Sequence, residues 1–315
     1  MLDYNVRKSN IYVLIVIISS LLLKYFIAPQ MAGLNLSLQF LLVFPEILLF
    51  LVSAIIYFLI TKEPILPTLR LKKIPFKTIL IAVGIGICSQ PIAILLSLLS
   101  QLIFPNNVTQ LLKMMNEIPF IYKLIIIAGV PALCEEIFAR GVALKGYDDV
   151  HIVKASLMNG LIFGIMHLNG QQFLYAFVLG TLFAYMVRVT GSIFTSMIAH
   201  FTVNGIQVSM AEIAVKVSEL SVKFGETSGQ QVPQMGELGL NSLPLNTILL
   251  AIISYSMLAC LGGGGIYLLL RSLKKTHSFN EKGINETKKV KVFDRYMIIL
   301  LILFIISIAA DLILG

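Results

Sequence analysis

Long apolar runs, each near the length of a membrane crossing, constrain this chain more than any other feature. Nine runs can cross a bilayer if one crossing takes about 20 residues. They are Ile11–Ile27, Leu38–Ile60, Ile79–Phe104, Ile121–Ala143, Ala155–Leu168, Phe173–Val189, Ile193–Met210, Thr247–Leu270 and Tyr296–Leu314. The sequence therefore predicts an all-α fold, a polytopic transmembrane helix bundle of about nine spans.

The composition excludes an ordinary soluble protein. Of the 315 residues, 57% are hydrophobic and 13% are charged, whereas a soluble domain is about half apolar and a quarter charged. The net charge of +8 could suggest nucleic-acid binding, but the basic residues lie in short loops between apolar runs. Such loops suit anionic lipid at the cytoplasmic face of a cell membrane. We therefore expect a multi-pass membrane protein that contacts lipid and binds no nucleic acid.

The positive-inside rule predicts the orientation. With the N terminus in the cytoplasm, 19 of the 24 Lys and Arg residues fall inside, four fall outside, and Lys24 lies within the first span. This bias indicates an odd number of spans, a cytoplasmic N terminus and an external C terminus. The first run carries Lys24 and has no clear cleavage site, so we interpret it as a retained helix rather than a signal peptide.

Three parts follow from the order of the runs: N-terminal transmembrane helices at 1–120, a core of four helices at 121–210, and an external loop with two further helices at 211–315. Pro105–Pro119 is expected to be an interfacial segment outside. Ala211–Asn246 is expected to be an external loop with at least one helical turn at its start. The glycines from Gly262 to Gly265 would allow close helix approach, or simply weaken that helix.

Three polar clusters interrupt consecutive apolar runs. An ionisable group in hydrocarbon costs several kcal/mol unless it is paired or faces water, so each cluster is a candidate functional site. The clusters are Glu135 and Glu136 with Arg140, Phe163 with His167, and His200 with Asn204.

The first cluster divides into a pair and a free carboxylate. Neighbouring side chains leave a helix about 100° apart, so Glu135 and Glu136 cannot do the same job. The i,i+4 spacing predicts an ion pair between Glu136 and Arg140. Glu135 is then free to face a cavity and act as a base. A structural network of all three charges is the alternative.

The other two clusters also follow i,i+4 spacing. Phe163 and His167 share a helix face, where the ring can pack against the imidazole. His200 and Asn204 share another, and both can donate hydrogen bonds to a developing oxyanion. Alone, His167 is more often a satisfied core residue than a catalyst, and His200 with Asn204 is compatible with hydrogen bonds between helices. Three clusters on consecutive spans favour a hydrolytic site.

The ordered pattern Glu-Glu-x-x-x-Arg, Phe-x-x-x-His and His-x-x-x-Asn resembles the CPBP family. These intramembrane endopeptidases include CAAX prenyl proteases of the Rce1 type and bacteriocin-processing or immunity (Abi) proteins. The resemblance covers roughly Ile121 to Met210. Many members carry an aromatic residue just before the arginine, where this chain has Ala139, with Phe138 one position earlier.

The resemblance implies that Glu135 and His167 activate a water for attack on a peptide carbonyl. His200 and Asn204 would stabilise the oxyanion, and Glu136, Arg140 and Phe163 would support the site. The substrate would be a membrane-associated protein or peptide, prenylated or not.

A metal is a further option. Glu135, His167 and His200 would make a His₂Glu set for catalytic zinc, although there is no His-Glu-x-x-His helix. The same residues suffice for a metal-free glutamate mechanism, and the sequence leaves both open.

Two non-proteolytic functions compete with this interpretation. A proton-coupled transporter could use the carboxylates and histidines as a proton relay. The lack of an internal repeat counts against a transporter built from inverted halves. An immunity or scaffold protein could carry the motifs without turnover, and nothing in the sequence excludes it.

Overall fold

The computed structural model describes residues 2–31, 33–104, 114–115, 117–228, 244–279 and 291–314, and every regular element in these residues is a helix. Several helices contain π-helical segments, labelled η. The elements are α1 (Leu2–Leu22), η1 (Leu23–Ile27), α2 (Ala28–Met31), α3 (Leu38–Glu46), η2 (Ile47–Val52), α4 (Ser53–Thr61), α5 (Ile65–Thr68), α6 (Phe76–Gln101), α8 (Phe120–Leu124), η3 (Ile125–Gly129), α9 (Val130–Glu136), η4 (Ile137–Ala143), α10 (Ile152–Met166), α11 (Gly170–Thr190), α12 (Phe194–Ser228), α13 (Leu245–Thr276) and α14 (Arg295–Leu314).

The all-helical membrane architecture is confirmed, but the count of about nine spans is not. Six helical stretches in the described residues are long and apolar enough to cross a membrane. They are Tyr4–Met31, Leu38–Thr61, Phe76–Gln101, Gly170–Thr190, Leu245–Thr276 and Arg295–Ile313.

The three expected crossings outside this set are α8 to η4, α10 and α12. The first contains Glu135, Glu136 and Arg140, and the third contains His200 and Asn204. Helix α10 has 15 residues, about 22 Å of helix, which is shorter than a hydrocarbon core of about 30 Å. The helices that miss the span criteria are therefore those that carry the three polar clusters.

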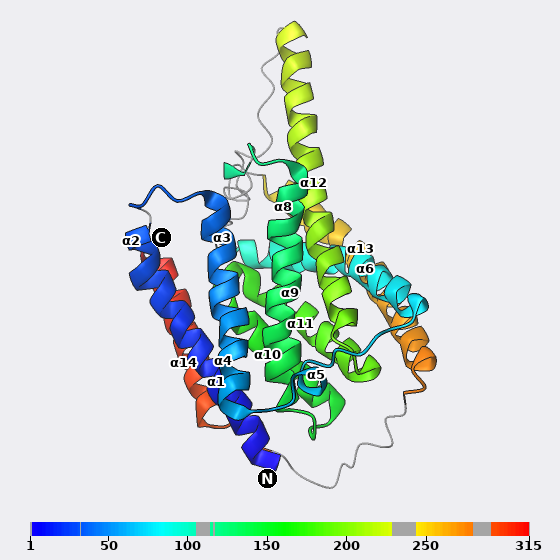
Figure 1. Cartoon of the computed structure of the whole chain (residues 1–315). Helices are drawn as coiled ribbons and strands as arrows, with labels where there is room; N and C mark the ends of the chain where they lie inside the picture. Colours follow the sequence, from blue (N-terminus) through cyan, green and yellow to red (C-terminus); the bar gives the residue numbers. More distant parts are fainter. Residues whose placement is uncertain are drawn as a thin grey trace.

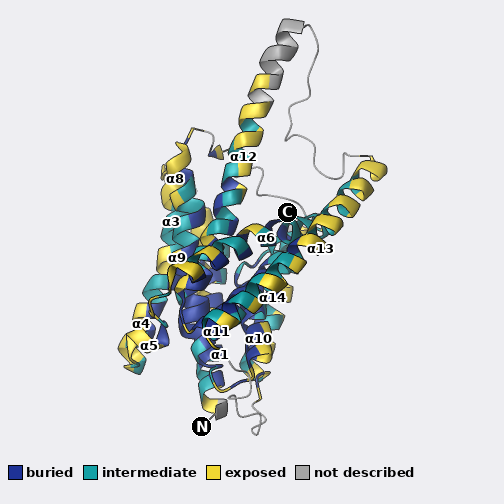
Figure 2. Ribbon diagram, turned by 90° about the vertical axis from the view of Figure 1, so that its right-hand side faces the viewer, coloured by how far each residue is buried: buried dark blue, intermediate teal, exposed yellow. Residues whose placement is uncertain are grey.

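Helix α11 lies inside the bundle and α13 on its outside. Half of the α11 window is buried, compared with 6% of the α13 window. Buried apolar side chains form two clusters: one joins α1 and α14 to η4 and α10, the other joins α6 to α12, and α11 contributes to both. Figure 2 shows buried residues in the middle of the bundle and exposed residues along much of α13. The polar clusters thus lie among helices rather than against lipid.

The two ends of the chain lie towards opposite ends of the bundle (Figure 1). This arrangement agrees with an odd number of crossings. Several apolar helices support a multi-pass membrane protein, while the side on which each terminus lies stays a prediction.

The expected loop at Ala211–Asn246 begins as a helix much longer than one turn. Helix α12 has 35 residues and ends at Ser228, so it projects beyond the bundle (Figure 1). Its extension has no proline before Pro233, and Lys216 lies 3.6 Å from Glu212 at i,i+4 spacing, a pair that favours helix. The rest of the expected loop, 229–243, and most of Pro105–Pro119 lie outside the described residues.

Two of the four glycines in the eighth apolar run, Gly262 and Gly265, lie close to a neighbouring helix, as expected. A Cβ added at Gly262 would lie 2.3 Å from the Cys88 carbonyl oxygen, and one at Gly265 would lie 2.8 Å from Cys88 Sγ. Helices α13 and α6 can therefore pack at this distance only because these positions lack side chains.

Candidate active site

The Glu136–Arg140 ion pair predicted from spacing is confirmed. Arg140 Nη1 lies 2.8 Å from Glu136 Oε1, and both side chains are fully buried. Glu136 ends α9 and Arg140 lies in the following η4, so one continuous helix holds both.

Glu136 also binds His200 of α12. His200 Nδ1 donates to Glu136 Oε1 over 2.9 Å. Because an ionised carboxylate only accepts, the proton of this bond lies on Nδ1. The second ring nitrogen, Nε2, lies 3.9 Å from Glu135 Oε2. Glu136 therefore bridges Arg140 and His200 and turns the free edge of the ring towards Glu135.

Two phenylalanine rings enclose this buried chain of charges. The Arg140 guanidinium lies 4.0 Å from the centroid of the Phe163 ring and 5.6 Å from that of Phe183. The His200 ring lies 5.8 Å from each of them. Arg140 Nη2 also donates to the Gly180 carbonyl over 3.1 Å. Phe183 and Gly180, both in α11, have no polar side chain and so gave no sequence signal.

His167 caps the C-terminal end of α10, and its ring packs 5.1 Å from Phe163 as expected. Its Nδ1 donates to the Phe163 carbonyl over 2.8 Å, which leaves Nε2 as a hydrogen-bond acceptor. The next residue, Leu168, has φ +46, a left-handed conformation that is costly for a bulky side chain. Lys24 donates to the Leu168 carbonyl over 3.1 Å, so a residue of the first helix holds the turn after His167.

A cavity of about 430 Å³ brings the predicted site residues together. Glu135, His167, His200 and Asn204 all line it, together with Phe163. Glu135 is 7% exposed, and its Oε2 is buried without a hydrogen-bond partner among the described residues. Asn204 Nδ2 donates one hydrogen to the Ile127 carbonyl over 3.1 Å; its second amide hydrogen remains for another acceptor. Glu136 and Arg140 are not lining residues and lie behind Glu135 and His200.

Among the polar lining residues that the sequence reasoning missed are Glu46 of α3 and Tyr175 of α11. Glu46 Oε2 is buried and has no hydrogen-bond partner among the described residues. The available signal was a lone acidic residue within an apolar run, which is a functional candidate by the same reasoning as the clusters. Tyr175 could not be distinguished from an ordinary membrane aromatic.

Whether Glu135, His167 and His200 bind zinc stays a prediction. Across the described part of the chain, no set of three or more His, Cys, Asp or Glu residues is arranged to hold an ion. His200 and His167 each use Nδ1 in a protein hydrogen bond and leave Nε2 free, as zinc-bound histidines do, and His200 Nε2 lies 3.9 Å from Glu135 Oε2. We assign no step to a metal.

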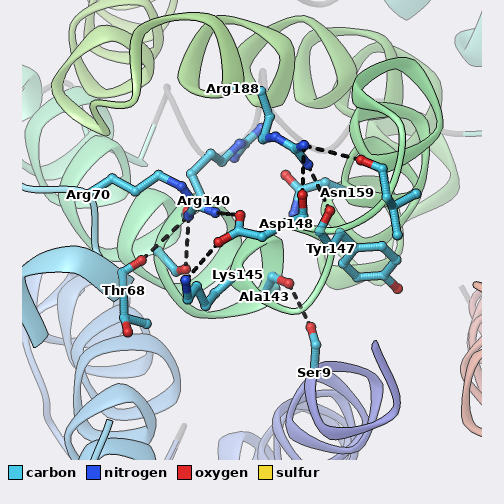
Figure 3. Close-up of polar contacts among 12 residues, drawn as sticks. Ser9, Thr68, Arg70, Arg140, Ala143, Lys145, Tyr147, Asp148, Asn159 and Arg188 are labelled. Carbon is cyan, nitrogen blue, oxygen red and sulfur yellow. Dashed lines mark hydrogen bonds and ion pairs between the residues drawn. The ribbon is translucent and has the colours of Figure 1, made fainter. Parts of the chain in front are cut away.

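A network of charged residues, which we call the basal network, braces the end of η4 (Figure 3). It consists of Arg70, Lys145, Asp148 and Arg188. Arg70 Nη1 donates to the Arg140 carbonyl over 2.6 Å, and the Asp148 carboxylate accepts from Arg70 Nη2 and from Lys145 Nζ. Arg188 donates to the Asp148 carbonyl over 3.0 Å.

The basal network affects the charge of Asp148 and the position of α12 relative to η4. Burial alone would raise the pKa of Asp148, but the positive charges of Arg70 and Lys145 outweigh it and lower that pKa below its ordinary value. The Arg70 carbonyl also accepts from the Ile193 backbone N–H over 3.1 Å. Arg70 therefore connects the end of η4 with the start of α12, the helices that carry Arg140 and His200.

Comparison with known proteins agrees with the motifs. Residues 117–206 match a family model described as type II CAAX prenyl endopeptidase Rce1-like. Neither a search of curated proteins nor a search of solved structures found a match. All seven residues of the three polar clusters lie within the matched segment. The segment 117–206 is thus similar to Rce1-like domains, and the match supports the CPBP and CAAX prenyl protease family indicated by the motifs.

Proposed function

We propose that this protein is an intramembrane endopeptidase that hydrolyses peptide bonds of membrane-associated proteins or peptides, with Glu135 as the base. The main support is the Glu135 carboxylate, whose Oε2 is buried without a hydrogen-bond partner among the described residues. It shares a cavity with His167, His200 and Asn204. A base needs an unsatisfied acceptor beside space for its substrate, and this cavity supplies both.

Glu135 and His167 can orient one water between them. His167 Nε2 accepts a hydrogen bond because Nδ1 already donates to Phe163. A water that donates one hydrogen to Glu135 and the other to His167 directs a lone pair at the substrate carbonyl. As the C–O bond forms, Glu135 takes the proton, and the carbonyl π electrons move to the oxygen. When the C–N bond breaks, that proton passes to the leaving amine.

Asn204 and His200 are the donors for the oxyanion. Asn204 offers its second amide hydrogen. Because Glu136 holds the His200 proton on Nδ1, Nε2 can donate only when the ring is doubly protonated. Glu136 accepts from His200 Nδ1 in either form of the ring and is itself held by its buried ion pair with Arg140.

The test is cleavage of a membrane-anchored peptide by the purified protein in lipid. Glu135→Gln, which keeps the shape without the charge, should abolish turnover. Asn204→Ala should retain traces, since loss of one oxyanion donor costs about 10²–10³ in rate. Glu212→Gln, also on α12 but outside the cavity lining, is the matched control and should cleave normally. A Glu135→Gln protein that keeps a sizeable fraction of the wild-type rate would remove Glu135 from the mechanism and favour a relay or scaffold.

A further inference from the structure

Acidic side chains outnumber lysine and arginine in the described lining of the cavity. Its lining includes Lys24, Glu46 and Glu135. Lys24 is already neutralised, because its Nζ lies 2.8 and 2.7 Å from the two carboxylate oxygens of Asp311 in α14. Arg140, behind the wall, is paired with Glu136. Among the described residues, Glu46 and Glu135 thus face the cavity without a Lys or Arg partner.

Glu46 is placed to act on a ligand rather than on the protein. It is the last residue of α3, follows Pro45, and lies outside the Rce1-like segment. Its Oε2 is buried and lacks a hydrogen-bond partner within the described parts of the chain, and it lines the same cavity as Glu135. An uncompensated carboxylate is costly within a membrane protein, and a second one facing the same cavity adds repulsion. A cation between them would offset both costs.

We propose that Glu46 is a specificity-determining residue that binds a cationic side chain, Lys or Arg, flanking the cleaved peptide bond. This proposal rests on the endopeptidase function and defines its substrate class. The cavity volume of about 430 Å³ is that of a pocket for a small ligand, about 300–1,000 Å³, which accommodates a few side chains. The polar groups Ser20, Gln172 and Gln207 also line it and can solvate a peptide backbone.

The experiment compares three membrane-anchored peptides that differ only in Lys, Gln or Glu beside the cleavage site. Wild-type protein should cleave the Lys peptide with a kcat/KM about tenfold above that of the Gln peptide, the effect of about 1.4 kcal/mol. In Glu46→Gln this ratio should fall close to one. Glu46→Asp should retain part of the preference, and Glu46→Lys should favour the Glu peptide. Glu212→Gln, the matched control, should keep the wild-type ratio.

Binding of the same peptides, measured by fluorescence without turnover, separates this inference from the proposed function. A Lys preference in binding that depends on Glu46, with no cleavage, would support the inference and refute the endopeptidase. Cleavage with no Lys preference, or with a preference unchanged in Glu46→Gln, would refute the inference alone. If Glu46→Gln and Glu46→Asp bind the Lys peptide as wild type does but cleave none of the three, Glu46 serves proton transfer with Glu135 and the specificity role is wrong.

Discussion

Replacing Arg140 by Met tests the buried charge chain behind the cavity. Methionine retains much of the side-chain volume, so the change removes mainly the positive charge. Glu136, fully buried in the folded protein, keeps its bond to His200 but loses its charged partner. Breaking one partner of a buried pair costs about 3–5 kcal/mol, because the remaining charge is uncompensated. This total includes two other contacts of the guanidinium that the change removes. They are the hydrogen bond to the Gly180 carbonyl, about 1 kcal/mol, and the cation–π contact with Phe163 at 4.0 Å, about 2 kcal/mol when desolvated.

Reversible unfolding in mixed micelles measures this loss. We expect Arg140→Met to lower the free energy of unfolding by about 3–5 kcal/mol. The double variant Glu136→Gln with Arg140→Met should be more stable than the single one, because it removes the uncompensated charge of Glu136. Both should lose activity, since the single variant leaves Glu136 without its guanidinium partner and the double variant leaves His200 without its carboxylate. A loss below about 1 kcal/mol, the value of an exposed pair, or a double variant less stable than the single one, would refute the reasoning.

Three further outcomes can be checked. Because the folded-state pKa of Asp148 lies below its ordinary value of 3.8, its stabilisation is present above about pH 4 and lost as the pH falls through the folded-state pKa. Asp148→Asn should therefore have a lower free energy of unfolding than wild type at neutral pH, and the two values should converge in acid. An equal difference in unfolding free energy at neutral and acidic pH would contradict this. Dialysis against a chelator should leave turnover unchanged. A loss of turnover that added zinc restores would support zinc binding by Glu135, His167 and His200. After replacement of the three native cysteines, cysteines at Ser228 and Lys275 should be labelled from opposite sides of the membrane. Labelling from one side would contradict the predicted topology.

Local geometry explains which contacts could be predicted from sequence. Residues four apart on a helix lie on one face regardless of the rest of the fold. The Glu136–Arg140 pair and the packing of Phe163 on His167 follow from that spacing and occur as expected. The number of crossings did not follow, because apolar content does not distinguish a lipid-facing helix from one buried in protein, as in α10.

Contacts between distant residues were decided by the packing of helices. The sequence determined an all-helical chain with three polar clusters in order, because hydrophobic runs and i,i+4 spacing are local properties. Only the tertiary structure showed that His200 Nδ1 donates to Glu136, 64 residues away. It also paired Lys24 with Asp311, 287 residues away. It also placed Glu46 at the cavity from outside the matched segment. The position of one helix against another depends on many side chains at once, so no spacing within a single run reveals it.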